Sequence, residues 1–275
     1  MSKKERVDVL LVERGLIETR EKAKRAIMAG IVYSDQERMD KPGVKIDENT
    51  PLHIKGLVMP YVGRGGFKLE KALQTFDFSV EGKTGVDIGS STGGFTDCAL
   101  QNGAKTMYAI DVGYNQLAWK LRNDQRVVVM ERTNFRYVEE DSFSKGLPEF
   151  ATIDVSFISL RLILPVLKKV IKDNGDVIAL VKPQFEAGKD EVGKKGIVRD
   201  KKVHMQVLEQ MIAFALQIGF DVKNLSFSPI TGGEGNIEFL LHLQASNADL
   251  GKNLMQIEVK EIVETAHQSL KKKDN

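Results

Sequence analysis

Several residue types are scarce in this sequence, and each scarcity excludes a class of protein. Cys98 is the one cysteine in 275 residues, so no disulfide can form within the chain and a reducing, cytoplasmic setting is expected. A membrane-spanning helix needs ~20 apolar residues, and no apolar run here approaches that length. Asp8 interrupts the N-terminal run VDVLLV, which argues against a signal peptide. The histidines are scattered without any Cys/His spacing, so no metal site is expected.

Net charge is also low. The chain carries +2 at pH 7, which is too small to indicate a nucleic-acid partner by itself. Hydrophobic residues make up 42% and charged residues 28%, which is typical of a globular protein with a packed core. Residues 1–64 carry a net charge of +3 and the remainder −1. The positive excess therefore lies in the N-terminal quarter and favours a module there that binds a polyanion.

Residues 1–58 are expected to form a small α+β domain. Residues 5–30 predict two helices, the second capped by Thr19 and ended by Gly30, and short strands follow. The second helix is rich in basic residues and is suited to binding the phosphates of a polyanion, although an ordinary solvated helix face would have the same charge. The candidate residues for this binding, in this region and the linker after it, are Arg6, Arg20, Lys22, Lys24, Arg25 and Arg64.

A linker at 59–65 separates this domain from a longer one at 66–250. In the longer domain apolar strands alternate with helices, which favours a mostly parallel sheet covered on both faces. The last two strands follow one another without a helix, so one of them is expected to be antiparallel. The expected strands are 84–90, 105–113, 126–130, 149–157, 175–185, 219–230 and 236–244.

Other features of the longer domain carry further predictions. Pro165 lies inside an expected helix at 159–171 and is predicted to kink it or to remove one hydrogen bond. Residues 183–200 form a long loop rich in glycine and lysine, either a clamp for RNA phosphate or a solvated loop. Residues 251–275 are expected to form a helical tail on the surface. The residues expected to pack in the interior are Cys98, Met107 and Trp119.

The most specific motif, VDIGSSTGGF, runs from Val86 to Phe95, where an apolar strand ends and a helix begins. Ligands of open α/β sheets bind at such turns, because glycines let the backbone approach the ligand. A dinucleotide site would show G-x-G-x-x-G, which this loop lacks. Its form, D-x-G-x-x-x-G-G, resembles the cofactor loop of class I methyltransferases and predicts their Rossmann-like sheet. The alternative is a tight structural turn.

The cofactor of that class, S-adenosylmethionine, carries a sulfonium and an ammonium group, and Asp87 is placed to serve this cationic part. Asp111 ends the next strand, where a carboxylate can accept two hydrogen bonds from ribose hydroxyls. Arg136 and Tyr137 are expected to border the same pocket. The expected cofactor-binding residues are Asp87, Gly89, Ser90, Ser91, Gly93, Gly94, Phe95, Asp111, Asn134 and Asp154.

Four charged residues stand within or beside apolar segments. Asp154 and Lys182 end two strands, Lys68 begins a helix and Glu238 interrupts the last strand. Each is costly to bury unless it is paired, and two acids with two bases can neutralise one another. Taken singly, each is compatible with a structural salt bridge. As a set beside a cofactor loop, they predict a catalytic group.

The segments GRGGFKL, DIGSSTGGFTD, IDVSFISL, LVKPQFEAG and EGNIEF together resemble the TlyA (haemolysin A) family of ribosomal RNA 2′-O-methyltransferases. The catalytic part of that family is similar to the FtsJ/RrmJ-type enzymes, and the first 60 residues resemble the small RNA-binding domain of ribosomal protein S4. The resemblance implies a catalytic Lys-Asp-Lys-Glu tetrad on Lys68, Asp154, Lys182 and Glu238. It also implies S-adenosylmethionine as cofactor and ribosomal RNA or a ribosomal subunit as partner, with the nucleotide (cytidine or another) and the oligomeric state left open.

Methyl transfer to a ribose hydroxyl requires in-line alignment and the removal of one proton. Lys182 is the candidate group for the proton. As a neutral amine it would be a general base, and as an ammonium it would orient the hydroxyl and stabilise the developing alkoxide. Flanking acids at Asp154 and Glu238 favour the ammonium, whereas burial favours the amine. Lys68 is expected to position the nucleotide or its phosphate.

Three other functions compete with this one. The first is a membrane-active haemolysin, as the family's name suggests, although nothing in the sequence would span a bilayer. The second is an RNA-binding module without catalysis that keeps a cofactor pocket, against which the complete set of four charged residues argues. The third is a nucleotide-dependent oxidoreductase on a similar sheet, which would bind a dinucleotide in place of S-adenosylmethionine.

Overall fold

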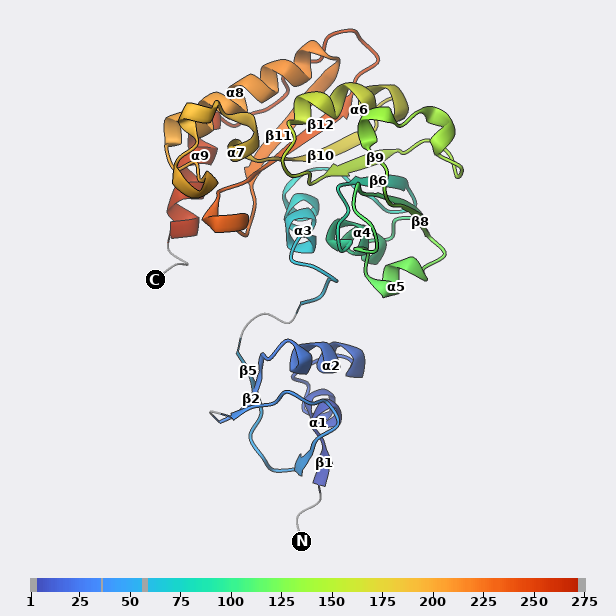
Figure 1. Ribbon diagram of the computed structural model, residues 1–275, viewed down its shortest axis with the longest axis vertical. Coiled ribbons are helices and arrows are strands. Elements are labelled where there is room, and N and C mark those ends of the chain that lie inside the picture. Colours follow the sequence, from blue (N-terminus) through green and yellow to red (C-terminus); the bar gives the residue numbers. More distant parts are fainter. Residues whose placement is uncertain (1–3, 36, 56–58, 272–275) are drawn as a thin grey trace. The chain divides into compact units, whose positions relative to one another are not determined.

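A computed structural model describes residues 4–35, 37–55 and 59–271. The chain forms two compact units, Met1–Tyr61 and Val62–Asn275, which are blue and cyan-to-red in Figure 1. The expected domain end at residue 58 and the last residues of the expected tail, 272–275, lie outside the described residues. The limits of the linker and the tail stay predictions.

The first unit packs two short helices beside small antiparallel β-pairs. Thr19 caps α2 by accepting a hydrogen bond from the N–H of Lys22, and Gly30 follows this helix with φ of +70°, so both predicted helix ends are confirmed. Nine apolar residues form its core, among them Leu11 and Ile27. Its elements are β1 (Lys4–Arg6), α1 (Val7–Glu13), α2 (Arg20–Met28), β2 (Val32–Ser34), β3 (Glu37–Arg38), β4 (Lys45–Asp47) and β5 (His53–Ile54).

The second unit is built on one seven-stranded sheet in the order β11-β12-β10-β9-β6-β7-β8. β12 runs antiparallel to both of its neighbours, and all other neighbouring strands are parallel. The predicted mostly parallel sheet with an antiparallel last pair is confirmed, as is the small α+β unit before it. The strands are β6 (Thr84–Ile88), β7 (Thr106–Ile110), β8 (Val127–Met130), β9 (Phe150–Ile153), β10 (Asp176–Val181), β11 (Phe220–Phe227) and β12 (Phe239–Ala245).

Helices cover both faces of this sheet. In Figure 1, α6 and α8 lie above it, and α3, α4 and α5 lie below it. Every residue of the central strands β6, β7, β9 and β10 is buried, which is why these strands are apolar almost throughout rather than alternating with polar residues. The helices are α3 (Gly66–Thr75), α4 (Gly94–Gln101), α5 (Trp119–Arg122), α6 (Leu164–Val170), α7 (Pro183–Glu186), α8 (Lys201–Gln217) and α9 (Val259–Lys271).

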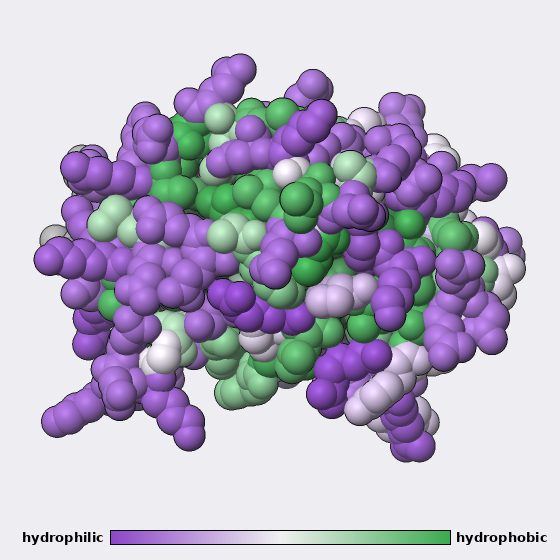
Figure 2. All heavy atoms as spheres, turned by 90° about the horizontal axis from the view of Figure 1, so that it is seen from above, coloured by the Kyte–Doolittle hydropathy of each residue, from purple (hydrophilic) through white to green (hydrophobic). Residues whose placement is uncertain are grey.

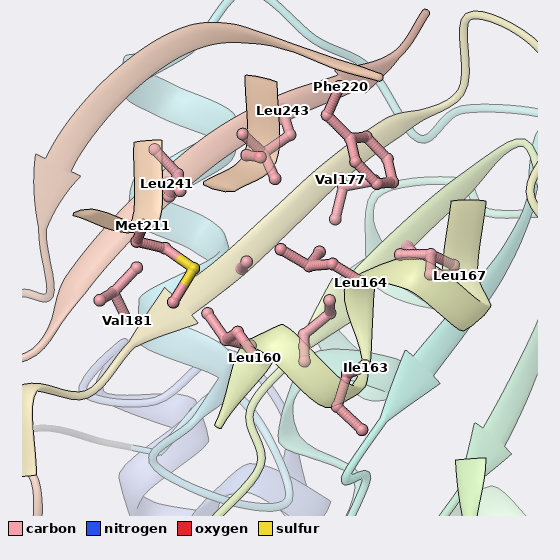
Figure 3. Packing of buried hydrophobic residues seen from close by; sticks show 14 of the residues in the cluster. Leu160, Ile163, Leu164, Leu167, Val177, Val181, Met211, Phe220, Leu241 and Leu243 are labelled. Carbon is pink, nitrogen blue, oxygen red and sulfur yellow. The ribbon is translucent and has the colours of Figure 1, made fainter. Parts of the chain in front are cut away.

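The main hydrophobic core lies between one face of the sheet and the helices α6 and α8 (Figure 3). Alternate residues of β10 point into it, because side chains along a strand face opposite sides in turn. Phe220 from β11 closes one side of this core. The other side chains labelled in Figure 3 are Leu160, Ile163, Leu164, Leu167, Val177, Val181, Met211, Leu241 and Leu243.

The C-terminal helix α9 belongs to this core. Its residues Ile262, Val263 and Ala266 are buried in the same apolar cluster. The segment before it is held to the sheet by a parallel bridge between Asn253 and Val222. The helix expected in the tail is present, and these contacts make it part of the second unit.

Two predictions about single residues are wrong. Pro165 lies in the first turn of α6, where its nitrogen needs no hydrogen-bond partner, and a separate 3-10 turn, Leu160–Leu162, precedes the helix. It therefore helps to begin the helix instead of kinking it. Trp119 is 78% exposed at the start of α5 and is not packed in the interior. Cys98 and Met107 are fully buried, as predicted.

The surface carries mainly charged and polar side chains. On the face that Figure 2 shows, hydrophilic residues surround smaller apolar areas. Across residues 4–35, 37–55 and 59–271, none of the helices combines the length and the apolar character that crossing a bilayer requires.

We predict that the contact of α6 with the sheet contributes strongly to stability. Leu164 is fully buried, whereas Leu162, two residues earlier, is 49% exposed. Leu164→Ala should lower the free energy of unfolding by about 2–5 kcal/mol, because it leaves a cavity in the core. Leu162→Ala, the matched control, should lower it by less than ~1 kcal/mol. Urea unfolding followed by circular dichroism measures both, and equal losses would contradict this assignment of the core.

Candidate active site

Polar side chains gather at one edge of the seven-stranded sheet. Gly89, Asp154 and Lys182 each follow the carboxyl end of a strand, β6, β9 and β10, and these strands are neighbours. Glu238 directly precedes β12, which is antiparallel, so its beginning lies at the same edge. Lys68 reaches this edge from α3. The topology of the sheet thus brings together residues far apart in the sequence, at the place where open α/β sheets bind ligands.

The four predicted catalytic residues form a chain of ion pairs, called the tetrad below. Nζ of Lys182 lies 2.6 Å from Oδ1 of Asp154, and Nζ of Lys68 lies 3.0 Å from Oδ2 of the same carboxylate. Nζ of Lys68 also lies 2.8 Å from Oε2 of Glu238. Two positive and two negative charges therefore alternate in a buried place and neutralise one another, which makes their burial tolerable.

The order of charges corrects one expectation. The sequence suggested that Asp154 and Glu238 flank Lys182. Within the described residues, Lys182 instead pairs with Asp154 and donates a hydrogen bond of 3.1 Å to the hydroxyl of Ser156. The lysine between the two acids is Lys68. The position of the Lys68 ammonium could not be predicted from the sequence, because it depends on where α3 packs.

The charges of the central pair are set by their neighbours. Burial opposes the charged form of Asp154, but the ammonium groups of Lys68 and Lys182 outweigh this effect and hold its pKa below the usual value. Burial likewise acts to lower the pKa of Lys68, and attraction to Asp154 and Glu238 outweighs it, so that the pKa is raised. At neutral pH the tetrad therefore contains a fixed carboxylate and a fixed ammonium at its centre.

Two cavities meet beside the tetrad. The first, the tetrad cavity, has a volume of about 320 Å³ and is lined by all four tetrad residues and by the glycine loop. The second, the apolar cavity, has a volume of about 370 Å³ and is lined by Asp111 and by apolar residues of the strand ends. Both are lined by Gly89, Ser91, Asp154 and Ser156. An elongated ligand with one apolar and one charged end fits this arrangement.

The glycine loop between β6 and α4 approaches other backbone so closely that side chains are excluded. Gly89 has φ of +82°, and a Cβ there would lie 2.6 Å from the carbonyl oxygen of Asp154. Gly93 has φ of +94° and begins α4. Both positions therefore need glycine, as predicted, because of their positive φ and, at Gly89, because of the close approach of other backbone.

Asp111 and Asn134 lie in the apolar cavity, as expected for cofactor-binding residues. The Asp111 carboxylate accepts hydrogen bonds from the N–H groups of Ser91, at 2.8 Å, and Gly113, at 2.7 Å. Each carboxylate oxygen has two acceptor positions, so one on each remains for a pair of ribose hydroxyls. Asn134 caps a 3-10 turn, Phe135–Tyr137, by accepting a hydrogen bond from the N–H of Arg136.

Asp87 lines the tetrad cavity, but its carboxylate is occupied by neighbours. It accepts hydrogen bonds from the N–H and hydroxyl of Thr96, at 3.0 and 2.7 Å, and from the hydroxyl of Thr152, at 3.1 Å. Burial raises the pKa of Asp87 to about 6, although these hydrogen bonds act against the rise. Asp87 therefore fixes the start of α4 to the sheet, in addition to any contact with a ligand.

The pKa of Asp87 gives a testable consequence for stability. Because the pKa of this carboxyl rises from 3.8 to about 6 on folding, the free energy of unfolding falls as the pH rises through this range. Asp87→Asn removes the buried charge and should stabilise the fold at pH 7.5 by about 1–3 kcal/mol. The gain should become smaller towards pH 4. Thermal unfolding at both pH values measures it, and a gain that does not depend on pH would contradict the assigned pKa.

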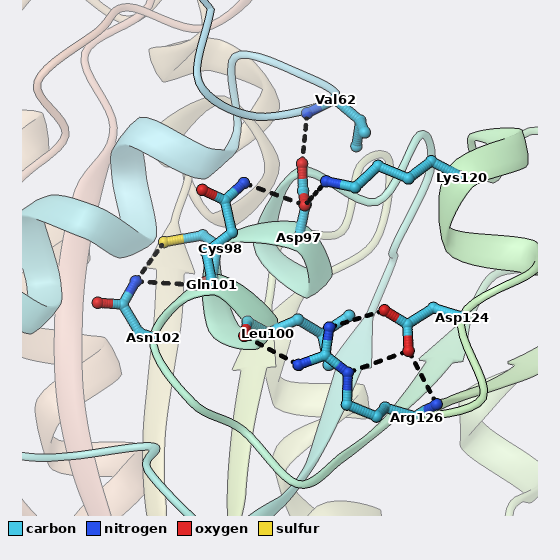
Figure 4. A network of polar contacts seen from close by, with 9 residues as sticks. All are labelled: Val62, Asp97, Cys98, Leu100, Gln101, Asn102, Lys120, Asp124 and Arg126. Atoms are coloured by element: carbon cyan, nitrogen blue, oxygen red, sulfur yellow. Dashed lines mark hydrogen bonds and ion pairs between the residues drawn. The ribbon is translucent and has the colours of Figure 1, made fainter. Parts of the chain in front are cut away.

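Asp97 ties the predicted linker, residues 59–65, to α4, the helix that follows the glycine loop (Figure 4). Its buried carboxylate accepts hydrogen bonds from the N–H of Val62, at 2.9 Å, and from Nζ of Lys120, at 2.8 Å. A Cβ on Gly94 would lie 2.9 Å from the backbone nitrogen of Gly66, so these segments touch. This places Arg64 on the lining of the tetrad cavity.

The remaining candidate RNA-binding residues lie in the first unit, and most of them are paired. Arg6 and Arg20 both contact the buried carboxylate of Asp8, whose pKa is lowered mainly by its hydrogen bond with Arg6. These two arginines therefore stabilise the unit as well as presenting charge. The other pairs are Lys22 with Glu18 and Lys24 with Glu21.

Several residues at the site were not foreseen. Ser156 accepts a hydrogen bond from Lys182, and the threonines around Asp87 hold its carboxylate. Phe157 has φ of +63° and is 91% exposed beside the apolar cavity, and its ring lies 5.1 Å from that of Phe185. Ser156 and Phe157 lie at the end of the predicted strand 149–157, close after Asp154, so position in the sequence was the available signal for them.

Comparison with known proteins identifies the family to which the chain is related. Residues 61–245 match the family model "FtsJ-like methyltransferase", and residues 5–51 match "S4 domain". The chain is 68% identical to "Putative rRNA methyltransferase YqxC" of Bacillus subtilis over 99% of this chain and 97% of that protein. It is 40% identical to "16S/23S rRNA (cytidine-2'-O)-methyltransferase TlyA" of Mycobacterium tuberculosis over 89% of this chain and 91% of that protein. A solved structure described as "Putative hemolysin from Streptococcus thermophilus" is 57% identical, with a TM-score of 0.79, and covers 100% of this chain and 99% of that one.

The fold and the site together define a methyltransferase with a small N-terminal α+β unit. The chain belongs to the FtsJ-like methyltransferase family and carries an S4 domain before the catalytic unit. The resemblance to the TlyA family that the sequence motifs indicated is confirmed by these matches.

Proposed function

We propose that this protein transfers a methyl group from S-adenosylmethionine to the 2′-hydroxyl of a ribose in ribosomal RNA. The observation that carries this proposal is the buried Lys182–Asp154–Lys68–Glu238 chain of ion pairs, which opens into a cavity that continues into a second, apolar one. The relative TlyA, named as an rRNA (cytidine-2'-O)-methyltransferase, supports the choice of RNA and of the 2′-oxygen.

The residues present fit the cofactor. The apolar cavity offers an aliphatic lining for an adenine, and Asp111 keeps free acceptor positions for its ribose. The glycine loop and the carboxylate of Asp154, where the two cavities meet, suit the positively charged end of the molecule. When bound, S-adenosylmethionine supplies a methyl group that is already activated by its sulfonium.

Lys182 is the residue proposed to orient the attacking hydroxyl, whose proton passes to solvent water as the methyl group is transferred to its oxygen. An ammonium has three donors, and Asp154 and Ser156 take two of them from Lys182, which leaves one for a substrate oxygen in the tetrad cavity. A group held in this way orients the hydroxyl and stabilises negative charge as it develops there. The fixed carboxylate of Asp154 keeps Lys182 in position.

Lys68 is proposed to act through Asp154 rather than on the nucleotide. Its ammonium is buried between two carboxylates that neutralise its charge, so its attraction to an RNA phosphate is weak. Glu238 completes the neutralisation, and a Cβ on Gly232 would lie only 2.1 Å from its Oε1, so the cavity wall fixes this carboxylate. Lys68 and Glu238 are thus positioning residues for the Asp154–Lys182 pair.

The proposal is tested with ribosomal subunits, S-adenosylmethionine labelled in its methyl group and alkaline hydrolysis of the product RNA. Alkali cleaves RNA through a free 2′-hydroxyl, so a methylated ribose protects the linkage that follows it. The expected result is label in alkali-resistant dinucleotides. Label only in mononucleotides would indicate methylation of a base, and absence of label from both subunits would contradict rRNA as the substrate.

A variant of Lys182 tests its assigned role. Lys182→Ala should reduce methyl transfer by about 10²–10⁴-fold, because the hydroxyl loses its orienting group. The affinity for S-adenosylmethionine, measured by calorimetry, should change less than ~3-fold, since no apolar contact is lost. Lys168→Ala is the matched control, because Lys168 donates to the carbonyl of Ser246 away from the tetrad. Unchanged turnover in Lys182→Ala would refute the role of this lysine.

A further inference from the structure

A group of basic residues beside the catalytic cavity has no part in the tetrad. It lies in residues 189–202, which carry a net charge of +3, whereas the net charge of residues 62–275 as a whole is zero. All six of its cations are exposed and form no ion pair within the described residues: Lys189, Lys194, Lys195, Arg199, Lys201 and Lys202. In the first unit, by contrast, most candidate RNA-binding residues are paired with acids.

Lys194 and Lys195 are carried by a defined turn. Gly193–Ile197 forms a short hairpin, in which the N–H of Gly193 donates to the carbonyl of Ile197 at 3.0 Å. Lys195 and Gly196 at its tip have φ of +66° and +71°. The tip thus adopts a backbone conformation that is costly for Lys195. The surrounding contacts must therefore hold this conformation in place.

The base of this hairpin is buried and held from two sides. Val198, at the base, is 2% exposed. Its N–H donates to Oδ1 of Asn236 at 3.1 Å, and its carbonyl lies 3.2 Å from Nε2 of His204 on α8. His204 in turn contacts His267 on α9 at 3.0 Å. The hairpin is therefore fixed to α8 and to the segment before β12, and His204 links it to α9.

Asn236 joins the hairpin to the wall of the tetrad cavity. Its Nδ2 donates to the carbonyl of Gly196, at 2.9 Å, and to that of Gly233, at 3.2 Å. Gly232 and Gly233 line the tetrad cavity, and Gly232 packs on the carboxylate of Glu238. One buried amide thus connects the hairpin with the turn that borders the carboxylate of Glu238.

Two of these cations lie at the positive end of a helix dipole. Lys201 and Lys202 occupy the first turn of α8, and the carboxylate of Asp200, which caps this helix by accepting a hydrogen bond from the N–H of Lys202 at 2.8 Å, is the one acid beside them. One carboxylate does not neutralise two lysines and the helix dipole, so a further anion would be favourable there. A phosphodiester backbone supplies closely spaced negative charges that match a row of unpaired lysines.

We propose that the basic turn, defined as Lys194–Lys202, binds the phosphate backbone of the substrate RNA next to the target nucleotide, and that Asn236 positions it relative to the tetrad. The inference rests on the proposed function for the identity of the RNA. It assigns to this segment the contact with the strand that enters the active site and leaves base recognition to other residues.

The test uses the full-length protein with Lys194→Gln and Lys195→Gln combined, and measures binding to isolated ribosomal RNA at several salt concentrations, together with methyl transfer. Each phosphate contact with a single strand contributes ~0.7 to the slope of log Kd against log salt. The double variant should therefore lower that slope by about 1.4 and weaken binding roughly 5- to 20-fold near 0.1 M salt. Its affinity for S-adenosylmethionine should be unchanged.

The matched control combines Lys105→Gln and Lys252→Gln, which remove the same charge from two exposed lysines at the opposite edge of the sheet. This control should leave the slope and the affinity for RNA unchanged. An equal loss in both double variants would show that only net charge matters and would overturn the proposal. So would an unchanged slope in the variant of Lys194 and Lys195.

Asn236→Ala tests the positioning role. It should weaken RNA binding and lower the salt slope, and adding it to the double variant should have little further effect, because the two changes act on one contact. Full additivity would overturn the link through Asn236. A fall in transfer with an unchanged salt slope would show that Asn236 acts through Glu238 alone. Absence of methyl transfer by the unaltered protein would contradict the proposed function, whereas the binding measurements would still decide the role of the basic turn.

Discussion

The carboxylate of Asp154 is the group on which the site depends. A buried carboxylate is tolerated only when cations and hydrogen bonds replace its water, and Asp154 has an ammonium on each of its two oxygens, from Lys182 and from Lys68. The same two contacts fix both lysines. Glu238 balances the remaining charge, so that the removal of any one member leaves an uncompensated charge in the interior.

The sheet explains why these groups meet. Parallel neighbouring strands end at one edge, and the antiparallel β12 begins there, so three strand ends and one strand start deliver side chains to one place. The glycine loop after β6 completes the edge, because Gly89 packs on the backbone of Asp154. The glycine loop and the tetrad are thus in direct contact. A change in the backbone of one should therefore displace the other.

Much of this arrangement was predictable from the sequence, because it follows from order and periodicity. Apolar runs predicted the strands, and Asp154 and Lys182 at their ends predicted the site. Interactions that depend on packing were not predictable. The placement of Lys68 between two acids depends on how α3 packs. Trp119 is exposed because the short α5 presents only Leu121 to the interior. The ion pair of Arg6 with Asp8 also depends on packing within the first unit.

The most direct test of this account is a crystal structure of the protein with S-adenosylhomocysteine, the product that remains after methyl transfer. The account predicts the adenosine in the apolar cavity, its ribose on Asp111, and the sulfur where the two cavities meet beside Asp154. Binding at another place, or a sulfur far from Lys182 with the tetrad closed off from it, would contradict the central claim that this chain of ion pairs is the catalytic centre.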